Sequence, residues 1–404
     1  MSDTVINGNI ASYNGSLDAN KMPDIWKVMQ KLEPYQTPIM QYTFFSGKAS
    51  QPCKNEDGKF SWFEKNWFPH YTTAIAAVTY SSGLTLTSAN CANKDIFRLH
   101  DIVIIEDDTL QMGFVSSVTA GGGSDVVITH PDGTTALSSI SKAGIVIKVT
   151  TKATIEENLN PTMKSLQEAE LYNYCSIETT LVGTTGRQQS GSYYTNGKTQ
   201  ADLLTDEISA MKLRFERMFL LNLIGGRVAA TGRNYTKGML GFITTNRSYY
   251  SGALPEETLD AHFQAVFAKG TNHKTHFCGS TQLAKIAAII KNKYGIVGGD
   301  VVVKKYGIDL IEYITPFGKV DIVWDPVLDG VFSDFGVTVD TKNIIGRYQD
   351  NDDKGSRKFR IERGVQTPGY DGKQDKLLAD LGCQYMQEST AGWLIGGTST
   401  LFGS

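Results

Sequence analysis

The sequence lacks any excess of positive charge. Its 39 lysines and arginines are balanced by 42 aspartates and glutamates, so the net charge is −3. No block of five like charges occurs along the chain. Proteins that hold duplex DNA through counterion release are normally far more basic. The charge balance therefore argues against nucleic acid as a tightly bound partner.

Long apolar runs and a secretory signal are also missing. The densest apolar run, residues 218–224, is far shorter than the ~20 residues that span a bilayer. The N-terminus has no basic stretch followed by an apolar one. The five cysteines are far apart and form no C-x-x-C pair: Cys53, Cys91, Cys175, Cys278 and Cys383. These features predict a protein that folds in a cytoplasm, with buried free thiols and no membrane partner.

Motifs that would indicate catalysis or cofactor binding do not occur. Gly121-Gly-Gly is the only glycine triplet, and it lacks the Lys-Ser/Thr of a phosphate-binding loop. It is typical of a hairpin turn. Neither G-x-S-x-G nor H-E-x-x-H is present. We therefore predict that the chain is not an enzyme and that it has no catalytic and no cofactor-binding residues.

Three short segments carry possible metal ligands, but each set is incomplete. The run Asp350-Asn-Asp-Asp-Lys-Gly355 resembles the start of a calcium loop, yet Lys354 stands where a ligand is needed and the closing glutamate is missing. His273 and His276 have no cysteine or carboxylate at a familiar spacing. Glu106-Asp-Asp108 ends an expected strand and is typical of a turn. We predict no metal site.

The composition is that of a globular protein with much β structure. Apolar residues make up 41% and charged residues 20% of the 404 positions. The 40 glycines exceed the usual ~7% and indicate many turns. At roughly 100–200 residues per domain, the length predicts two or three domains. Because expected strands outnumber expected helices, the predicted fold class is α+β.

The first 57 residues are expected to form an extended N-terminal arm. Pro34 and Pro38 break any long helix, so only one short helix is expected, near Met22–Leu32. The segment 1–50 has no apolar face large enough to fold alone, and we expect it to be ordered only in an assembled particle. Residues 58–72 follow as an aromatic-rich strand. A carbohydrate-binding platform is the alternative interpretation of its aromatic side chains.

Residues 82–150 are predicted to form a separate all-β module. Several short strands, separated by turn signals such as Pro131-Asp-Gly-Thr134, favour a small barrel or sandwich. The segments 58–72 and 165–187 flank this module, and both are β-rich. We expect them to pair as the two arms of one hairpin with the module at its far end.

The clearest helix is expected over residues 200–224. Apolar residues at spacings of four and three form its buried face: Leu204, Ile208, Met211, Phe215 and Met218. Thr199 is the expected N-cap, and Gly225-Gly226 is the expected stop. Two shorter helices are expected at 256–269 and 281–294. Strands are expected at 301–304, 309–314, 319–324, 336–340, 357–362, 381–387 and 392–395.

Several segments carry a resemblance to a known family. Thr37-Pro-Ile-Met-Gln-Tyr42 precedes the strand that contains Trp62, and Tyr172-Asn-Tyr-Cys-Ser-Ile-Glu-Thr-Thr-Leu-Val-Gly-Thr-Thr-Gly186 precedes the long helix. Leu221-Asn-Leu-Ile-Gly-Gly226 leads to Gly238-Met-Leu-Gly-Phe242, and the tail runs from Arg360-Ile-Glu-Arg-Gly-Val-Gln366 to Cys383-Gln-Tyr-Met-Gln-Glu388. In this order, they resemble the major capsid proteins of tailed bacteriophages with the Hong Kong 97-type fold.

The resemblance implies a division of the chain into the parts of that capsid fold. These would be an N-terminal arm (1–57), an E-loop hairpin (58–81 and 151–190) and a small β insertion (82–150). A spine helix with the peripheral domain (191–255) would follow, then an axial domain with connecting strands (256–345) and a return to the peripheral domain (346–404). The insertion departs from the simplest members of the family, whose E-loop carries no folded module.

The resemblance also implies a structural function. The protein would assemble with itself into hexamers and pentamers of an icosahedral shell that encloses double-stranded DNA. It would be part of the virion capsid and would assemble in the cytoplasm of a bacterial host. Further partners would be a portal, cement or scaffolding proteins, and packaged DNA held without sequence specificity. The alternatives are an encapsulin-like compartment shell and a carbohydrate-binding or carbohydrate-degrading protein.

Overall fold

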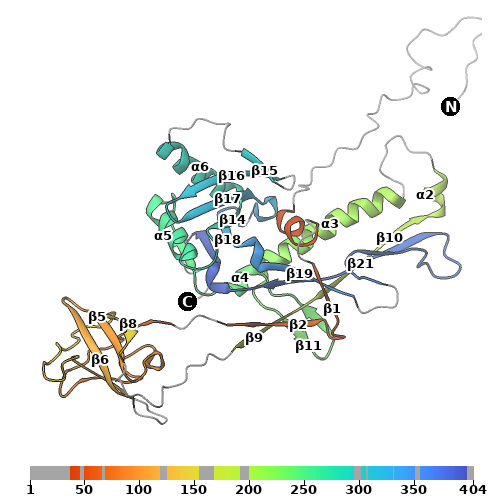
Figure 1. Ribbon diagram of the computed structural model, residues 1–404. Helices are drawn as coiled ribbons and strands as arrows, with labels where there is room; N and C mark the ends of the chain where they lie inside the picture. Colours follow the sequence, from red (N-terminus) through yellow and green to blue (C-terminus); the bar gives the residue numbers. More distant parts are fainter. Residues whose placement is uncertain are drawn as a thin grey trace, which may run out of the picture. The chain divides into compact units, whose positions relative to one another are not determined.

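The chain forms two compact units with mixed helices and strands. The computed structural model describes residues 37–45, 50–65, 69–118, 125–153, 168–191, 200–294, 302–305, 308–330, 332–350 and 355–397. Unit 1 comprises Met1–Trp62 and Leu171–Ser404, and unit 2 comprises Phe63–Glu170 (Figure 1). Unit 2 is therefore an insertion into unit 1.

Unit 2 is an antiparallel six-stranded sheet. Its strands follow the order β3 (Tyr71–Thr73), β8 (Val146–Lys152), β5 (Asp101–Glu106), β6 (Leu110–Val118), β7 (Val126–Thr129) and β4 (Leu84–Leu86). Alternate side chains such as Val103 and Ile105 are buried in its core. The expected start at residue 82 is too late, because β3 pairs with β8 and Ala74 and Val78 belong to the same core.

The segments 58–72 and 165–187 pair as expected only over residues 59–64 and 169–174. β2 (Lys59–Glu64) pairs with β9 (Ala169–Tyr174). Residues 71–73 instead join the sheet of unit 2. The second half of the other arm, β10 (Ser176–Thr185), pairs with a strand from the C-terminal part of the chain. A β-rich composition indicates a strand but does not identify its partner.

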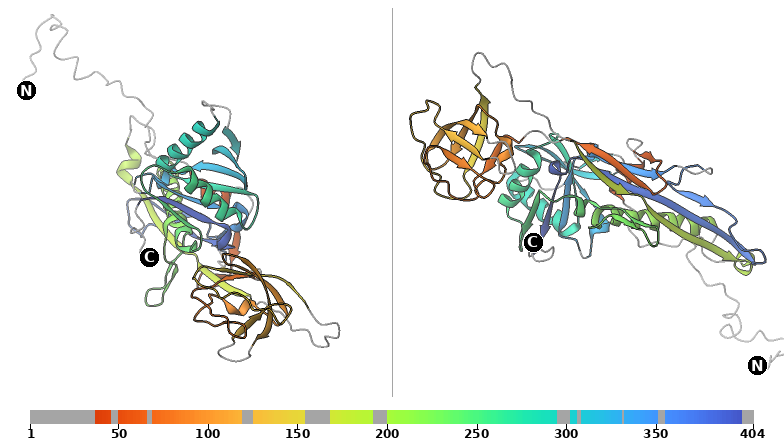
Figure 2. Two further views of the ribbon diagram at one scale, coloured as in Figure 1. Left: turned by 90° about the vertical axis from the view of Figure 1, so that its left-hand side faces the viewer. Right: turned by 90° about the horizontal axis from the view of Figure 1, so that it is seen from below.

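The first sheet of unit 1 follows the order β1 (Gln51–Cys53), β19 (Ile344–Gln349), β21 (Gly372–Tyr385) and β10, and β20 (Arg360–Glu362) also pairs with β21. β10 and β21 run antiparallel from the pair Ser176–Leu381 to the pair Thr185–Gly372. The long helix α3 (Gln200–Leu221) lies along this ribbon (Figures 1 and 2). The apolar face of α3 packs on Leu377, Ala379 and Leu381 of β21 in one core.

The second sheet of unit 1 has seven strands. Their order is β13 (Arg247–Tyr250), β22 (Gly392–Gly396), β18 (Phe335–Val339), β14 (His273–Cys278), β17 (Gly318–Trp324), β16 (Ile308–Thr315) and β15 (Val302–Lys305). Helices α5 (Glu256–Phe267) and α6 (Ser280–Tyr294) contribute Phe263 and Ile286 to a core with this sheet. β22 lies in this second sheet, so the segment 346–404 is divided between both sheets and does not return as one piece.

Several expected element boundaries differ from the structure. α3 ends at Leu221 rather than residue 224. The side-chain amide of Asn222 donates to the carbonyl oxygen of Thr236 at 2.9 Å, which leads the chain away from the helix axis. β21 begins at Gly372, well before the expected residue 381. The strands β13 and β19 were not predicted. Arg247–Tyr250 and Ile344–Gln349 contain polar residues that obscure the apolar pattern of a strand, although both segments are strands of their sheets.

Part of the expected N-terminal arm belongs to the core of its own chain. Thr37–Phe44 contains α1 (Pro38–Met40) and the following helical turn Gln41–Phe45, and Ile39, Met40 and Phe44 are buried. The ring of Phe44 stacks on that of Phe219 in α3 with centroids 6.0 Å apart. The expectation that all of residues 1–50 need an assembled particle to be ordered is therefore wrong for 37–44. The expected helix near Met22–Leu32 lies outside the described residues.

Lys274 joins α5 to the second sheet from a fully buried position. Its ammonium group donates to the carbonyl oxygens of Val266 at 2.8 Å, Lys269 at 2.9 Å and Thr390 at 2.6 Å. Two of these carbonyls lie at the C-terminal end of α5, where a positive charge is favourable. Lys274 thus donates to the carbonyl groups of Val266 and Thr390 at buried positions.

Replacing this lysine by methionine should destabilise unit 1. Lys274→Met keeps the apolar stem but removes the donor for three carbonyls, and the expected loss is about 2–3 kcal/mol because the desolvation cost of the ammonium group is also removed. Denaturant unfolding of the purified chain measures this loss. Lys319→Met is the matched control, since Lys319 is exposed and pairs with Glu312 at 2.8 Å. Equal stability of both variants would contradict the role of Lys274.

Candidate functional site

The end of α3 leads into a group of apolar side chains that the rest of unit 1 leaves uncovered. Ile224 is 80% and Leu223 is 53% exposed, and Val228 and Tyr235 are exposed as well. They line a hollow of about 550 Å³ together with Leu221, Asn222, Gly226 and Arg227. We call Leu223, Ile224, Val228 and Tyr235 the α3-end patch. Clustered exposed apolar side chains of this kind mark interaction surfaces.

Local hydrogen bonds explain why the α3-end patch keeps its shape. β11 (Gly226–Val228) and β12 (Arg233–Tyr235) form a hairpin whose turn is closed by Gly232, with its φ of +64°. Arg227 forms an ion pair with Asp57, and the amide of Asn234 donates to the Asp57 carbonyl oxygen at 2.7 Å. These polar contacts fix the hairpin on loop 54–58, while the apolar side chains contribute little to the fold.

A second uncovered surface lies on β10. Ile177 and Leu181 are both more than half exposed, and they lie on the same face of the strand because they are four residues apart. The opposite face contacts α3, where Arg214 bonds Glu178 of β10 and pairs with Glu207 at 2.6 Å. Burial raises the pKa of Glu178, while the Arg214 guanidinium opposes this shift. α3 therefore covers only one face of the β10–β21 ribbon.

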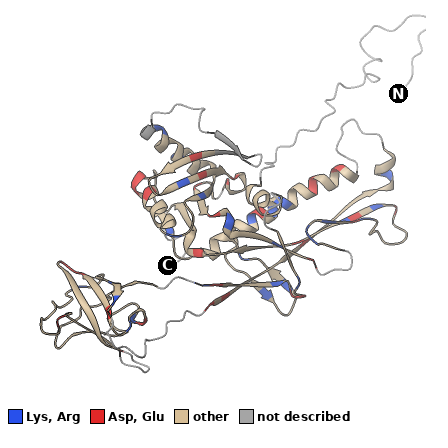
Figure 3. Ribbon diagram, in the orientation of Figure 1, with Lys and Arg blue, Asp and Glu red and all other residues tan. Residues whose placement is uncertain are grey.

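Charges of both signs are interleaved on the described residues, as Figure 3 shows. Ion pairs on the first sheet illustrate the pattern: Arg357 with Asp380 at 3.3 Å, and Arg360 with Glu362 at 2.8 Å. Such mixed charge provides little long-range field for attracting a polyanion. The apolar surfaces are therefore the stronger candidates for the functional site.

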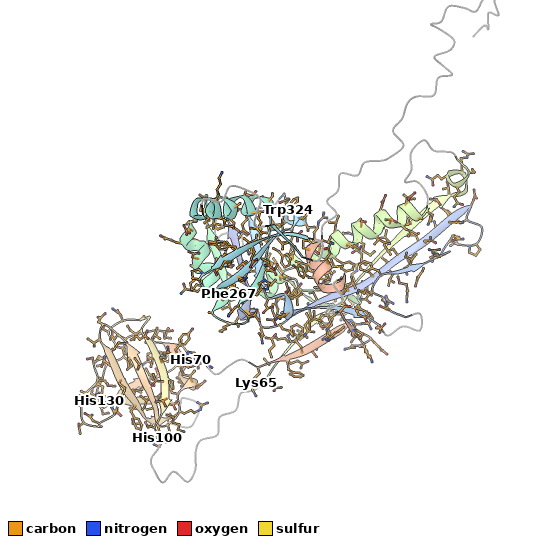
Figure 4. All side chains as sticks on the ribbon, turned by 45° about the horizontal axis from the view of Figure 1, so that its top comes forward. Lys65, His70, His100, His130, Phe267 and Trp324 are labelled. Carbon is orange, nitrogen blue, oxygen red and sulfur yellow. The ribbon has the colours of Figure 1, made fainter. Side chains whose placement is uncertain are left out.

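The residues considered for metal binding are not brought together. His273 and His276 are three residues apart on strand β14, so their side chains project from opposite faces. His273 is exposed and contacts Asp321 at 3.1 Å, whereas His276 is buried beside Thr338 and Gln282. Figure 4 shows His70, His100 and His130 at separate places on unit 2.

The acidic segments that were considered for metal binding are likewise not gathered into a site among the described residues. Glu106-Asp-Asp108 begins the turn between β5 and β6, and Asp108 pairs with Lys142 at 2.7 Å. Residues 351–354 of the calcium-like run and the glycine triplet at 121–123 lie outside the described residues. Within the described ranges, three or more histidine, cysteine, aspartate or glutamate side chains nowhere gather at metal-binding distance.

Two of the three described aromatic side chains of the strand 58–65 belong to a core. Phe60 and Trp62 are buried with Cys53 and Cys175, and their rings stack at 6.2 Å from each other. Phe63 is exposed, and Trp67 and Phe68 lie outside the described residues. A platform needs several exposed rings side by side, whereas Phe60 and Trp62 serve as core residues.

The five cysteines are all buried free thiols, as predicted. Burial raises the pKa of the Cys278 thiol and raises that of Cys383 to about 12, which keeps these thiols protonated and unreactive. The described helices include none that is both long and apolar enough to cross a bilayer.

The family follows from a comparison of the whole sequence. The family model described as SU10 major capsid protein matches residues 6–398. The chain belongs to this capsid protein family. No curated protein is detectably similar to it. The SU10-type chain is thus a structural capsid subunit, as the resemblance implied.

One of the similar solved structures, with a TM-score above 0.5, agrees with this assignment at the level of the fold. A structure of Gordonia phage Cozz has a TM-score of 0.51 and 9% identity, with 99% of each chain covered. The capsid of cyanophage P-SCSP1u has a TM-score of 0.40 and 12% identity, covering 62% of this chain and 81% of that one. The encapsulin from Synechococcus elongatus PCC 7942 has a TM-score of 0.42 and 13% identity, covering 57% and 77%. The SU10-type chain has the Hong Kong 97-type α+β fold.

The α3-end patch was missed by sequence analysis for an identifiable reason. Leu223 and Ile224 continue the apolar pattern of α3, and the Gly225-Gly226 stop placed both residues inside the helix. The available signal was Asn222, a poor residue for a helix interior and a good one for ending a helix. In a capsid subunit, side chains that a helix end leaves exposed are available for neighbouring copies.

Proposed function

We propose that this major capsid protein assembles into hexamers and pentamers of an icosahedral shell that encloses double-stranded DNA. The α3-end patch is the observation that carries this proposal beyond the family assignment. It presents exposed apolar side chains on a hairpin held in place by polar contacts. A shell subunit requires such surfaces, because its contacts with neighbours have to bury apolar area. The near-neutral net charge fits a shell that encloses DNA without binding it tightly.

We further propose how parts of the chain serve this shell. The β2–β9 pair corresponds to the E-loop, and unit 2 is a module inserted in it. The ribbon of β10 and β21 with α3 corresponds to the peripheral domain and its spine helix, and the seven-stranded sheet to the axial domain. A portal, with cement or scaffolding proteins, would complete the particle in the cytoplasm of a bacterial host. The chain itself would supply structure and no catalysis.

A charge placed in the α3-end patch tests the proposal. Ile224→Asp should lower the yield of closed particles more than tenfold, because each copy would have to desolvate a carboxylate at its contact. Electron microscopy and sedimentation measure the particle fraction. Ile224→Val is the matched control and should assemble normally. The side chain is 80% exposed, so the unfolding midpoint of both variants should stay that of the wild type.

The possible outcomes distinguish an error about the α3-end patch from an error about the shell function. Normal particles from Ile224→Asp would show that the α3-end patch is not a subunit contact. Failure of the wild-type chain to form closed particles under any condition that keeps it folded would contradict the shell function itself. Closed wild-type particles from infected or expressing cells that never contain DNA would instead indicate a compartment shell.

A further inference from the structure

A buried pair of carboxyl groups lies where the N-terminal segment meets the long helix. Glu216 of α3 and Asp325, directly after β17, are both fully buried. The backbone N–H of Ile39 donates to Glu216 Oε1 at 2.7 Å, and that of Met40 donates to Oε2 at 2.8 Å. Glu216 therefore holds the first turn of the segment Thr37–Phe44 by two hydrogen bonds.

Asp325 has an oxygen atom that requires a proton donor. Its Oδ1 accepts a hydrogen bond from the N–H of Val327 at 2.9 Å, within its own turn. Its Oδ2 is buried without a donor among the described residues, and the Asp325 and Glu216 carboxyl groups interact directly. In the described part of the chain, no lysine, arginine or histidine forms an ion pair with either group. One proton between the two carboxyls supplies the missing donor and removes the repulsion between two buried negative charges.

The surroundings of the pair favour its protonated state. Burial raises the pKa of Glu216 and of Asp325, and the proximity of Asp325 raises that of Glu216 further. Asp329 adds a negative charge on the side of Asp325. The other titratable neighbours are the thiol of Cys278 on β14 and, on β21, the thiol of Cys383 and the hydroxyl of Tyr385, which donates to the Phe219 carbonyl at 2.8 Å.

A lysine contacts the far end of the segment. The ammonium group of Lys358 donates to the carbonyl oxygen of Phe44 at 2.6 Å. Among the described residues, Glu216 is thus the side chain that satisfies the N–H groups at the start of the segment, and Lys358 binds its last turn. The two ends are held independently, and only the Glu216 end depends on a shared proton.

We propose that Glu216 and Asp325 form a one-proton clasp that fixes residues 37–44 on α3, and that loss of this proton releases the segment. With the proton, Glu216 accepts both backbone hydrogen bonds and faces a neutral partner. Without it, two negative charges share one apolar site, and Glu216 or Asp325 has to leave it. Because the folded chain binds this proton more tightly than the unfolded chain, the stability that the clasp provides is present at low pH and is lost as the pH rises. The capsid subunit thereby couples the position of its N-terminal segment to pH.

Hydrogen exchange of the purified, unassembled full-length chain tests the clasp. Protection factors, corrected for intrinsic exchange, are measured for the amides of Ile39 and Met40 between about pH 6 and about pH 9. We expect the wild-type values to fall more than tenfold over this range, the equivalent of one proton bound one pKa unit more tightly in the closed state. Asp325→Asn should remain protected throughout, because its amide donates permanently to Glu216 and its carbonyl oxygen still accepts from Val327.

Further variants make the result decisive. Glu216→Gln should lose protection at every pH, because one of the two N–H groups would then face an amide donor. Glu207→Gln, the same change on the same helix, should keep the pH response of the wild type. If Glu216→Gln does not fold, the comparison of the wild type with Asp325→Asn is sufficient. Wild-type protection that is constant over the range, or an equal fall in Asp325→Asn, would overturn the proposal.

Discussion

Replacing two buried histidines, His262 and His276, should abolish about 4 kcal/mol of acid-induced destabilisation between about pH 7.5 and about pH 5. Both imidazoles lie in the core between α5 and the seven-stranded sheet and are fully buried. Burial lowers the pKa of His262 to about 3 and that of His276 to about 4. The folded chain therefore keeps both rings neutral at pH values where the unfolded chain protonates them.

A continuous chain of hydrogen bonds accounts for the neutral state. The Oγ of Ser248 lies 3.0 Å from His262 Nδ1, and His262 Nε2 lies 3.0 Å from Thr338 Oγ1. Thr338 Oγ1 lies 2.8 Å from His276 Nδ1, and His276 Nε2 lies 3.0 Å from Gln282 Oε1. If each donor points toward Gln282, Ser248 donates the first hydrogen bond and each later group accepts one and donates the next, with Gln282 donating on to the Leu394 carbonyl oxygen at 2.9 Å. A proton added to either ring would face a hydroxyl that donates in this arrangement, so that hydroxyl would have to turn and the new positive charge would stay buried.

The sign and size of the effect follow from the two pKa values. A histidine with a lowered pKa supplies its full stability above the unfolded value of ~6.5 and loses it as the pH falls toward the folded value. At about pH 5 each histidine costs about 2 kcal/mol. Buried carboxyls such as Asp325 have raised pKa values and act in the opposite direction. The measurement must therefore compare variants rather than rely on the wild type alone.

Denaturant unfolding at both pH values provides this comparison. His262→Gln and His276→Gln should each lose about 2 kcal/mol less than the wild type on acidification. Thr338→Val is the matched control: it removes the bridging hydroxyl and destabilises the chain at both pH values, but it keeps both imidazoles and hence the acid response. An acid response that is the same in the wild type and in both histidine variants would show that these rings are already charged in the folded chain.

The parts of the fold that sequence analysis predicted well are those set by local periodicity. The apolar spacing of α3 depends only on neighbouring turns of one helix, and Leu204, Met211 and Phe215 are indeed buried. β5 spans Asp101–Glu106, as its short apolar run between turn signals predicted. Such signals need no knowledge of distant segments.

The features that were missed depend on partners far away in the sequence. The first half of β21 is polar, and it is a strand because β10 pairs with it from Gly372 to Leu381. Glu216 looks like one more polar residue of an amphipathic helix until Ile39 and Met40 are placed against it. The α3-end patch depends on where the helix ends, which is the least reliable feature of a helix prediction. Resemblance to a family supplied the fold that these local signals could not.

Phe215→Ala should cost unit 1 about 3–5 kcal/mol of its free energy of unfolding. Phe215 is 1% exposed, and its ring contacts Phe219 at a centroid distance of 5.9 Å and Phe359 at 6.4 Å. It lies between α3 and the first sheet, where the N-terminal segment also packs. Truncation leaves a cavity that cannot collapse, because the backbones of α3 and β21 are each held by regular hydrogen bonds. The variant should appear mainly as insoluble chain and lost particles.

Two further changes on α3 separate the cavity from other effects. Phe215→Leu fills part of the space and should lose less than half as much as Phe215→Ala. Arg217→Ala lies on the exposed face of the same helix and should stay within about 0.5 kcal/mol of the wild type. The unfolding midpoint followed by tryptophan fluorescence reports on all three, and an unchanged slope would indicate that stability alone has changed. A Phe215→Ala chain as stable as Arg217→Ala would mean that the apolar face of α3 does not hold this core together.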